Sequence, residues 1–516
     1  MKTGPTRIDP SERLVTAKLQ TVHVRVNDAA TGQPTPARVR FTDADGAYYA
    51  PLGRLSDFAT GRNQDVGGNV RLGMQPWAYV DGSFEINLPA GVIHVAIHKG
   101  PEYRPVTETI QLQPGKLALR FVIERWIDMP ALGWYSGDGR AHALSPHGTL
   151  LEAQAEDVHV VNLLASPVEL SVPGGNKTAL TNILAFSGQQ PALSTPGYIV
   201  AINTHNSHPI LGSLGLLHCH RVVYPLTFGG TDGSDDWTLA DWCDQCHRKN
   251  GLVVWTRAWQ ENAEFFLGEL PVDLQLGKID AFEVDHYEDS PFDVIPSWYD
   301  LLEAGIQVPL IGSSGKESNA SALGVMRTYA RLQPGQEFSY KNWIEAVRAG
   351  RTFITNGPAL LLSVNNQDPG ALLDLDRPGE TVHIRAEALC LLAFQSLEIL
   401  VNGVVMASTD EATLEVDLPI LEGGWLAARC KGTQQIFDCP ANQCLFAHTS
   451  PVYLRIKGVP AHVSKEAVGK LQLQIDRLEA WVNEKAKFSS DRERSRFLEL
   501  VGTARATLLA RFSRVQ

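Results

Sequence analysis

The sequence lacks the features that mark membrane-spanning, secreted and disulfide-stabilised proteins. Its 516 residues contain no apolar run of roughly 18 residues, the length that a transmembrane helix requires. The first 15 residues are polar and have no apolar core segment, so they do not resemble a secretory signal. Seven cysteines are few and odd in number for a disulfide framework. Cys430, Cys439 and Cys444 leave room for one bridge, but reduced thiols in a cytoplasmic protein are the simpler expectation.

Positive charge is also scarce, since 57 acidic residues face 45 lysines and arginines and the net charge is -12. A nucleic-acid partner is not expected, because such proteins present a basic face. Nothing in the sequence indicates a membrane partner or an oligomeric state. Apolar residues make up 44% and charged residues 20%, which is ordinary for globular proteins and excludes disorder of the whole chain. At roughly 150 residues per domain, the length predicts about three or four domains.

Two regions of the chain alternate apolar and polar residues with a period of two, which is typical of half-buried strands. In residues 1–130 the alternation occurs at 21–26, 84–88 and 93–97, and it predicts an N-terminal β-sandwich. In residues 358–457 it occurs at 381–386, 397–401 and 413–418, and it predicts a second β-sandwich.

The other two regions contain helical patterns. Residues 131–357 alternate strands with helices, which predicts an αβ barrel. The expected strands are 157–162, 251–255, 279–284 and 308–311, and the expected helices are 150–156, 237–249, 296–304 and 340–349. Residues 458–516 predict a helical C-terminal extension, with apolar residues at helical spacing from 471 to 481 and a second helix at 491–512. The predicted fold class is therefore multidomain α/β plus β.

The most informative motif is segment 133–142, GWYSGDGRAH, which opens the expected barrel. It resembles the start of the PHP (polymerase and histidinol phosphatase) metallohydrolases, and more closely their carbaryl-hydrolase-like branch, CehA/McbA. Further segments resemble that branch in the same order: 81–84, 100–103, 150–164, 209–217, 251–255 and 351–358. The resemblance covers roughly residues 20–455. It implies a distorted αβ barrel that hydrolyses ester, carbamate or phosphoester bonds with a divalent metal such as zinc, manganese or iron.

The sequence departs from this family at the expected metal ligands. The family's first motif reads Asp-x-His-x-His, whereas this chain has Asp138-Gly-Arg140-Ala-His142. Arginine cannot ligate a metal, because its guanidinium has no lone pair to give and stays protonated. The other expected ligand positions are also changed, and by the resemblance they fall at His205, Ser213, Arg257 and Gly315, with Lys316 beside Gly315.

Three interpretations of the altered site remain open. In the first, Arg140, Arg257 and Lys316 form a cationic pocket for a small, anionic ligand. In the second, the site is closed by salt bridges that involve Asp138, Glu283 and Asp285. In the third, a metal site survives with ligands drawn from His142, His205, His208, His286 and Glu283. In all three, the side chains follow predicted strands, so we expect them to converge at the carboxyl ends of the barrel strands.

Several other motifs have an ordinary structural explanation beside the functional one. Cys243-x-x-Cys246-His matches the attachment pattern of c-type haem, but it lies in an expected helix, which favours ordinary helix cysteines. Segment 313–319, SSGKESN, lacks the spacing of a phosphate-binding loop. His218 and His220 flank Cys219, as in a metal cluster or on a surface strand. The aromatic residues near the expected site line a pocket or belong to the core: Trp134, Tyr135, Trp255, Trp259 and Tyr287.

Overall fold

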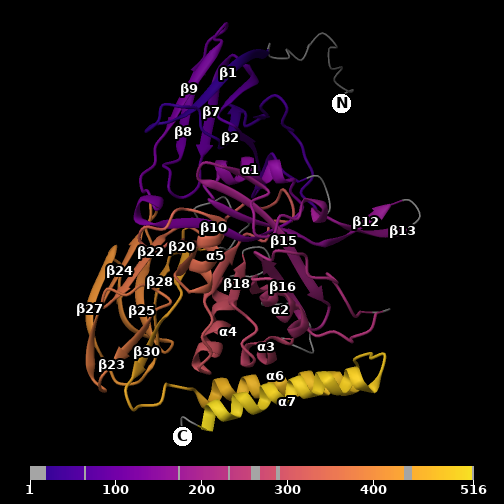
Figure 1. Ribbon diagram of the computed structural model, residues 1–516. Helices are drawn as coiled ribbons and strands as arrows, with labels where there is room; N and C mark the ends of the chain where they lie inside the picture. Colours follow the sequence, from indigo (N-terminus) through magenta and orange to yellow (C-terminus); the bar gives the residue numbers. More distant parts are fainter. Residues whose placement is uncertain are drawn as a thin grey trace, which may run out of the picture.

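The computed structural model describes residues 19–62, 66–172, 175–230, 233–256, 268–285, 291–434 and 444–513. These residues form a mixed α/β structure with more strand than helix (Figure 1). The predicted mixed class is confirmed. The division into separate domains stays a prediction.

The N-terminal region consists of two sheets that enclose a common apolar core (Figure 1). One sheet has the order β6 (Ser83–Pro89), β1 (Leu19–Asp28), β9 (Ala118–Ile123). The other has the order β4 (Asn69–Leu72), β5 (Gln75–Val80), β2 (Ala37–Asp43), β7 (Gly91–His98), β8 (Val106–Leu112), and β3 (Tyr48–Tyr49) pairs with β2. The alternating residues Val22, Val24 and Val26 of β1 are fully buried in this core, as the period-two pattern requires.

The central region is a curled sheet that forms half of a barrel. Its strands follow the order β19 (Leu310–Ser313), β18 (Ala281–Asp285), β17 (Leu252–Thr256), β16 (Gly212–Leu217), β15 (Tyr198–His208), β11 (Val160–Ala165), β10 (Trp134–Ala141), β20 (Arg327–Arg331), β21 (Thr352–Thr355). Strand β14 (Leu193–Thr195) pairs with β15, and the hairpin of β12 (Pro167–Val172) and β13 (Gly175–Leu180) projects beyond the sheet (Figure 1). The predicted barrel is thus an open, curled sheet in the described residues, since β19 and β10 are not paired as strands.

Five helices accompany this sheet: α1 (Pro146–Ala155), α2 (Leu239–Arg248), α3 (Leu270–Gln275), α4 (Pro291–Glu303) and α5 (Tyr340–Arg348). Helices α2 and α5 match the predicted ranges closely. Helix α1 begins four residues before the predicted 150, because the Ser145 side chain accepts a hydrogen bond from Gly148 N and Pro146 occupies the first turn. The short helix α3 was not predicted, since six residues are too few to show a helical period.

One sheet of the second β-rich region continues the central sheet. Strand β21 pairs with β29 (Phe446–Thr449), and the sheet continues through β28 (Gly424–Lys431), β25 (Ser396–Val401) and β26 (Val404–Thr409). Strand β30 (Val452–Ile456) pairs with β28 and with β23 (Leu372–Leu375). The facing sheet has the order β22 (Ala359–Val364), β24 (Glu380–Leu389), β27 (Thr413–Ile420). Hydrogen bonding therefore crosses the boundary predicted at residue 357.

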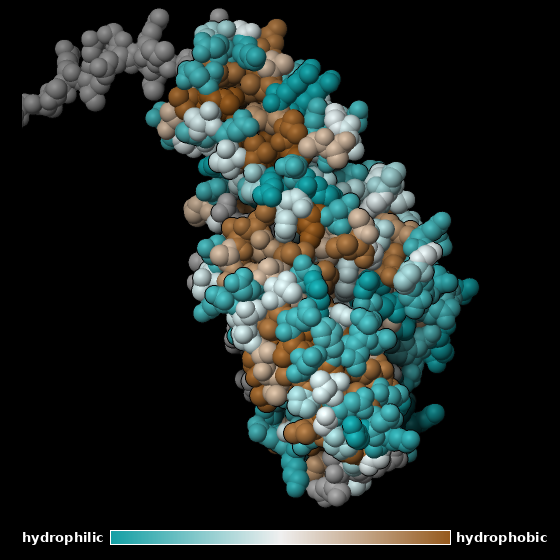
Figure 2. All heavy atoms as spheres, turned by 90° about the vertical axis from the view of Figure 1, so that its left-hand side faces the viewer, coloured by the Kyte–Doolittle hydropathy of each residue, from teal (hydrophilic) through white to brown (hydrophobic). Residues whose placement is uncertain are grey.

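The outer face of β24 and β27 carries charged pairs such as Arg385 with Glu415 and His383 with Asp417. Figure 2 shows the side of the molecule that includes these strands, where hydrophilic residues cover much of the lower half. The apolar residues of β24 point inward, so Val382 and Ile384 are fully buried.

The C-terminal extension is a hairpin of helices α6 (Lys465–Glu484) and α7 (Asp491–Ser513), as predicted. It packs beneath α3 and α4 (Figure 1), where Leu471, Ile475 and Trp481 join the core of the central region. Leu473 is the exception to the predicted apolar face, since 49% of its surface is exposed.

Candidate functional site

The candidate site lies where the curl of the central sheet brings β10 and β18 together. The side chain of Arg140, on β10, is 1% exposed and reaches the two carboxylates of β18. Its Nε donates to Glu283 Oε1 at 3.0 Å and Oε2 at 3.1 Å, and its Nη2 donates to Asp285 Oδ2. Because side chains alternate along a strand, Glu283 and Asp285 face the same side of β18.

Charge pairing stabilises this buried guanidinium. Burial by itself lowers the pKa of Arg140, but Glu283 and Asp285 act in the opposite direction and the net shift is upward. Arg140 therefore stays charged, and its charge is balanced by carboxylates of the protein. A third carboxylate, that of Glu317, lies 4.0 Å from Arg140 Nη1.

Two predicted histidines adjoin this cluster. His142 Nε2 lies 3.5 Å from Arg140 Nη1, and its Nδ1 lies 3.2 Å from the Leu164 carbonyl oxygen. The ring of His205 is centred 5.2 Å from that of His142, and its Nε2 lies 2.9 Å from Thr256 Oγ1. The structure thus brings together four of the predicted site residues, Arg140, His142, His205 and Glu283, with Asp285 beside them.

His208, which the sequence predicts as a metal ligand, does not belong to this cluster. Its Nδ1 accepts hydrogen bonds from Ile210 N at 3.1 Å and Leu211 N at 2.9 Å. Its Nε2 consequently carries the proton and donates to Asp235 Oδ1 at 2.9 Å. Both ring nitrogens are used to hold the chain after β15, so neither offers a lone pair to a metal.

Lys316 also differs from its prediction as part of a cationic cluster with Arg140. Its side chain is fully buried, with Nζ 3.2 Å from Glu152 Oε2 and 2.6 Å from the Ser321 carbonyl oxygen. Glu152 lies on α1, so Lys316 links the loop after β19 to that helix. Its charge is matched there and does not add to that of Arg140.

Asp138, which the sequence predicts to be catalytic, links β10 to the loop after β19 through hydrogen bonds. Its carboxylate is fully buried and accepts hydrogen bonds from Arg140 N, Ser314 N, Ser314 Oγ and Gly324 N. Burial raises the pKa of Asp138, while these donors act in the opposite direction. All four of these donors belong to the protein. The amide of Ser314 is likewise directed at Asp138 and does not form a phosphate-binding loop.

Two predicted site residues, Arg257 and His286, lie outside the described residues, as do Trp259 and Tyr287. Sequence reasoning included Asp285 only in the salt-bridge interpretation, and it did not include Glu317 or Thr256. The alternation of Glu283 and Asp285 on one strand was the available signal for Asp285. No sequence signal marked Thr256, which belongs to the site only because the fold places its hydroxyl 2.9 Å from His205 Nε2.

The remaining motifs are mainly structural. Cys243 and Cys246 lie on α2 and are buried in the core, and Cys246 Sγ lies 3.2 Å from Cys219 Sγ. Burial raises the pKa of both helix thiols. Trp255 is 2% exposed and belongs to the same core. These contacts favour the ordinary explanation, core cysteines and core aromatics, over haem attachment.

A divalent metal does not fit the described residues, because the Arg140 guanidinium lies against the carboxylates that would hold it. In the part of the chain that the structure describes, no three His, Cys, Asp or Glu side chains are grouped to hold a metal ion. No helix among those residues is long and apolar enough to cross a membrane.

A scan of protein-family models and a search of curated proteins each found no match to this sequence.

Proposed function

We propose that this chain is a non-catalytic binding protein on a metallohydrolase-like scaffold, with the Arg140 guanidinium in the place of the metal. The observation that carries the proposal is the bonding of Arg140 to Glu283 through both carboxylate oxygens and to Asp285. Segment 133–142 resembles the carbaryl-hydrolase-like branch of the PHP family, in which a metal-binding histidine is expected at the position of Arg140.

The geometry supports binding over hydrolysis for an electrostatic reason. A divalent cation beside Glu283 and Asp285 would lie close to a guanidinium that cannot lose its proton. Two like charges at about 4 Å repel by roughly 4 kcal/mol at the effective dielectric of a partly buried site, and more for a divalent ion. We therefore derive no hydrolytic step through a metal at this position.

An anionic ligand held by Arg140 is the second candidate that the sequence offers. The described residues around Arg140 supply three carboxylates, those of Glu283, Asp285 and Glu317. Arg62 pairs with Glu317 at 3.2 Å, so two guanidinium groups face three carboxylates. Because carboxylates of the protein already bond to Arg140, the proposed binding function does not depend on an anion at this position.

The proposal is tested by the hydrolysis of p-nitrophenyl acetate and bis(p-nitrophenyl) phosphate with and without added Mn²⁺ or Zn²⁺. We expect the protein to add nothing to the metal-catalysed background, and Arg140→His to behave in the same way because other ligand positions have changed. Metal-dependent turnover by the wild type that His142→Ala abolishes would contradict the proposal. Matched His220→Ala protein, altered at an exposed histidine outside the cluster, controls for non-specific metal binding.

A further inference from the structure

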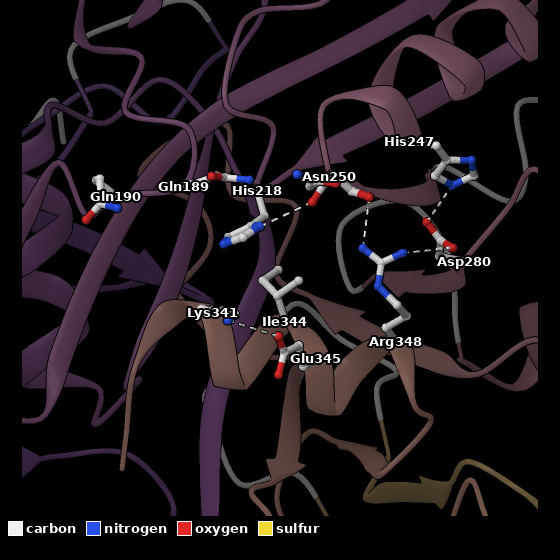
Figure 3. A pocket seen from close by; sticks show the side chains of 11 residues that line it. Gln189, Gln190, His218, His247, Asn250, Asp280, Lys341, Ile344, Glu345 and Arg348 are labelled. Atoms are coloured by element: carbon white, nitrogen blue, oxygen red, sulfur yellow. Dashed lines mark hydrogen bonds and ion pairs between the residues drawn. The ribbon is translucent and has the colours of Figure 1, made fainter. Parts of the chain in front are cut away.

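A cavity of about 770 Å³, shown in Figure 3, is lined by residues at the amino ends of β17 and β18. Asn250 and Gly251 in its wall precede β17, and Asp280 precedes β18. His218 follows β16, which runs antiparallel to β17 and so ends on the same side. Helix α5 forms the facing wall (Figure 3). Because Glu283 and Asp285 lie toward the carboxyl end of β18, this cavity is separate from the Arg140 cluster.

The charged side chains of the cavity are paired with one another. Arg348 donates through Nη1 to Asp280 Oδ1 at 3.3 Å and through Nη2 to the Gly251 carbonyl oxygen at 2.8 Å. Lys341 Nζ lies 3.7 Å from Glu345 Oε1 on the same helix. Two basic and two acidic side chains therefore balance in the wall. His247 is a further titratable group there, and its Nε2 lies 3.0 Å from Asp280 Oδ2.

A neutral histidine provides a hydrogen-bond acceptor in this balanced cavity. His218 is 9% exposed, and its Nδ1 lies 3.3 Å from the Asn250 carbonyl oxygen. A carbonyl only accepts, so Nδ1 carries the proton, and burial lowers the pKa of His218, which keeps the ring neutral. The lone pair is then on Nε2, which Figure 3 shows on the far side of the ring from Asn250, toward Gln190 and Lys341.

The rest of the wall contains groups that both donate and accept. Gln189, Gln190 and Asn250 present carboxamides, and Ile344 is an apolar side chain in the wall. A hydroxyl matches this set, since it donates to an imidazole nitrogen and accepts from an amide or ammonium group. Several adjacent hydroxyls on an uncharged carbon skeleton form more hydrogen bonds with these side chains than a single ionic group does. The volume lies within the range of small-molecule pockets, roughly 300–1,000 Å³.

We propose that this cavity binds a neutral polyhydroxy compound, a saccharide or sugar alcohol, with a ligand hydroxyl donating to His218 Nε2. The inference is independent of the proposed function of the Arg140 site, because it uses residues at the other ends of the strands.

The experiment is saturation-transfer difference NMR on the full chain, with maltose and myo-inositol as probes. We expect transfer to at least one of the two probes in the wild type. Loss of one buried hydrogen bond of about 1.4 kcal/mol should weaken that binding about tenfold in His218→Leu. Gln190→Leu, at an exposed position, is a second variant that does not risk the fold and should also weaken the signal.

His220→Leu is the matched control. His220 Nδ1 makes the same kind of contact, 3.1 Å from the Lys249 carbonyl oxygen, but His220 is exposed and outside the cavity wall. Its signal should equal that of the wild type. The proposal is overturned if neither probe shows transfer, or if His218→Leu and Gln190→Leu both keep the full wild-type signal. It is also overturned if inorganic phosphate or glutamate competes with the probes in the wild type but not in Arg348→Gln, since the cavity would then be an ion site.

Discussion

Replacing Arg140 with methionine removes the guanidinium and keeps an unbranched side chain of similar length. The variant leaves Glu283 and Asp285, which are 1% and 7% exposed, without their shared cation. Removal of one partner from a buried ion pair costs about 3–5 kcal/mol, because the remaining charge stays desolvated. We therefore expect Arg140→Met to destabilise the contact between β10 and β18 by that amount at neutral pH.

Hydrogen–deuterium exchange with mass spectrometry measures this effect locally, in peptides that contain β10 and β18. Since 1.4 kcal/mol corresponds to a factor of ten, amides that exchange through opening of this contact should exchange at least about 100-fold faster. Arg385→Met is the control, because Arg385 and its partner Glu415 are 54% and 53% exposed and pair at 3.8 Å. Exposed pairs of this kind contribute little, so exchange in β24 should hardly change.

A double-mutant cycle with Glu283→Gln distinguishes the loss of the Arg140–Glu283 interaction from a general loss of core packing. Once Arg140 is absent, the neutral amide removes one of the two adjacent carboxylate charges, so the double variant should be more stable than Arg140→Met alone. Additive losses, or unchanged exchange in β10 and β18 of Arg140→Met, would show that the guanidinium does not hold these strands.

Three further predictions concern other buried groups. Lys316→Met should destabilise the fold by about 3–5 kcal/mol in urea unfolding, because it leaves Glu152 buried and unpaired; an unchanged midpoint would refute this. Burial lowers the pKa of His448 from 6.5 to about 3, so the native state keeps the ring neutral while the unfolded chain binds a proton. The free energy of unfolding should therefore fall as the pH drops from 6.5 toward 3, and His448→Gln should flatten that slope; an equal slope in both proteins would contradict it. Burial raises the pKa of the Cys243 thiol, so iodoacetamide should label it only after unfolding, as peptide mass spectrometry would show, and rapid labelling of the native protein would argue against its burial.

Much of the secondary structure follows from the hydropathy pattern, because that pattern is local. The alternation at 21–26 and 93–97 corresponds to β1 and β7, and the helical patterns at 237–249 and 340–349 correspond to α2 and α5. The continuity of the central sheet with the second β-rich region was not predictable, since the pairing of β21 with β29 joins residues about 90 positions apart. The capping signal of Ser145 and Pro146 was present in the sequence and would have placed the start of α1 correctly.

The candidate site was partly predictable, because the alternation of side chains along a strand is also a local pattern. Arg140, Glu283 and Asp285 lie on strands, where alternation fixes which side chains share a face. Lys316 lies in the loop after β19, where no period sets the direction of a side chain, and His208 is the last residue of β15. Their partners, Glu152 on α1 and Asp235 before α2, are distant in sequence, and only the folded chain brings them together.

The metal content of the purified protein tests the replacement of the metal by Arg140 most directly. Protein expressed in medium supplemented with zinc, manganese and iron, and then passed through a desalting column, is analysed by inductively coupled plasma mass spectrometry. The account predicts well below one equivalent of any of these metals per chain. One tightly bound equivalent that is retained by the wild type and lost in His142→Ala would contradict it.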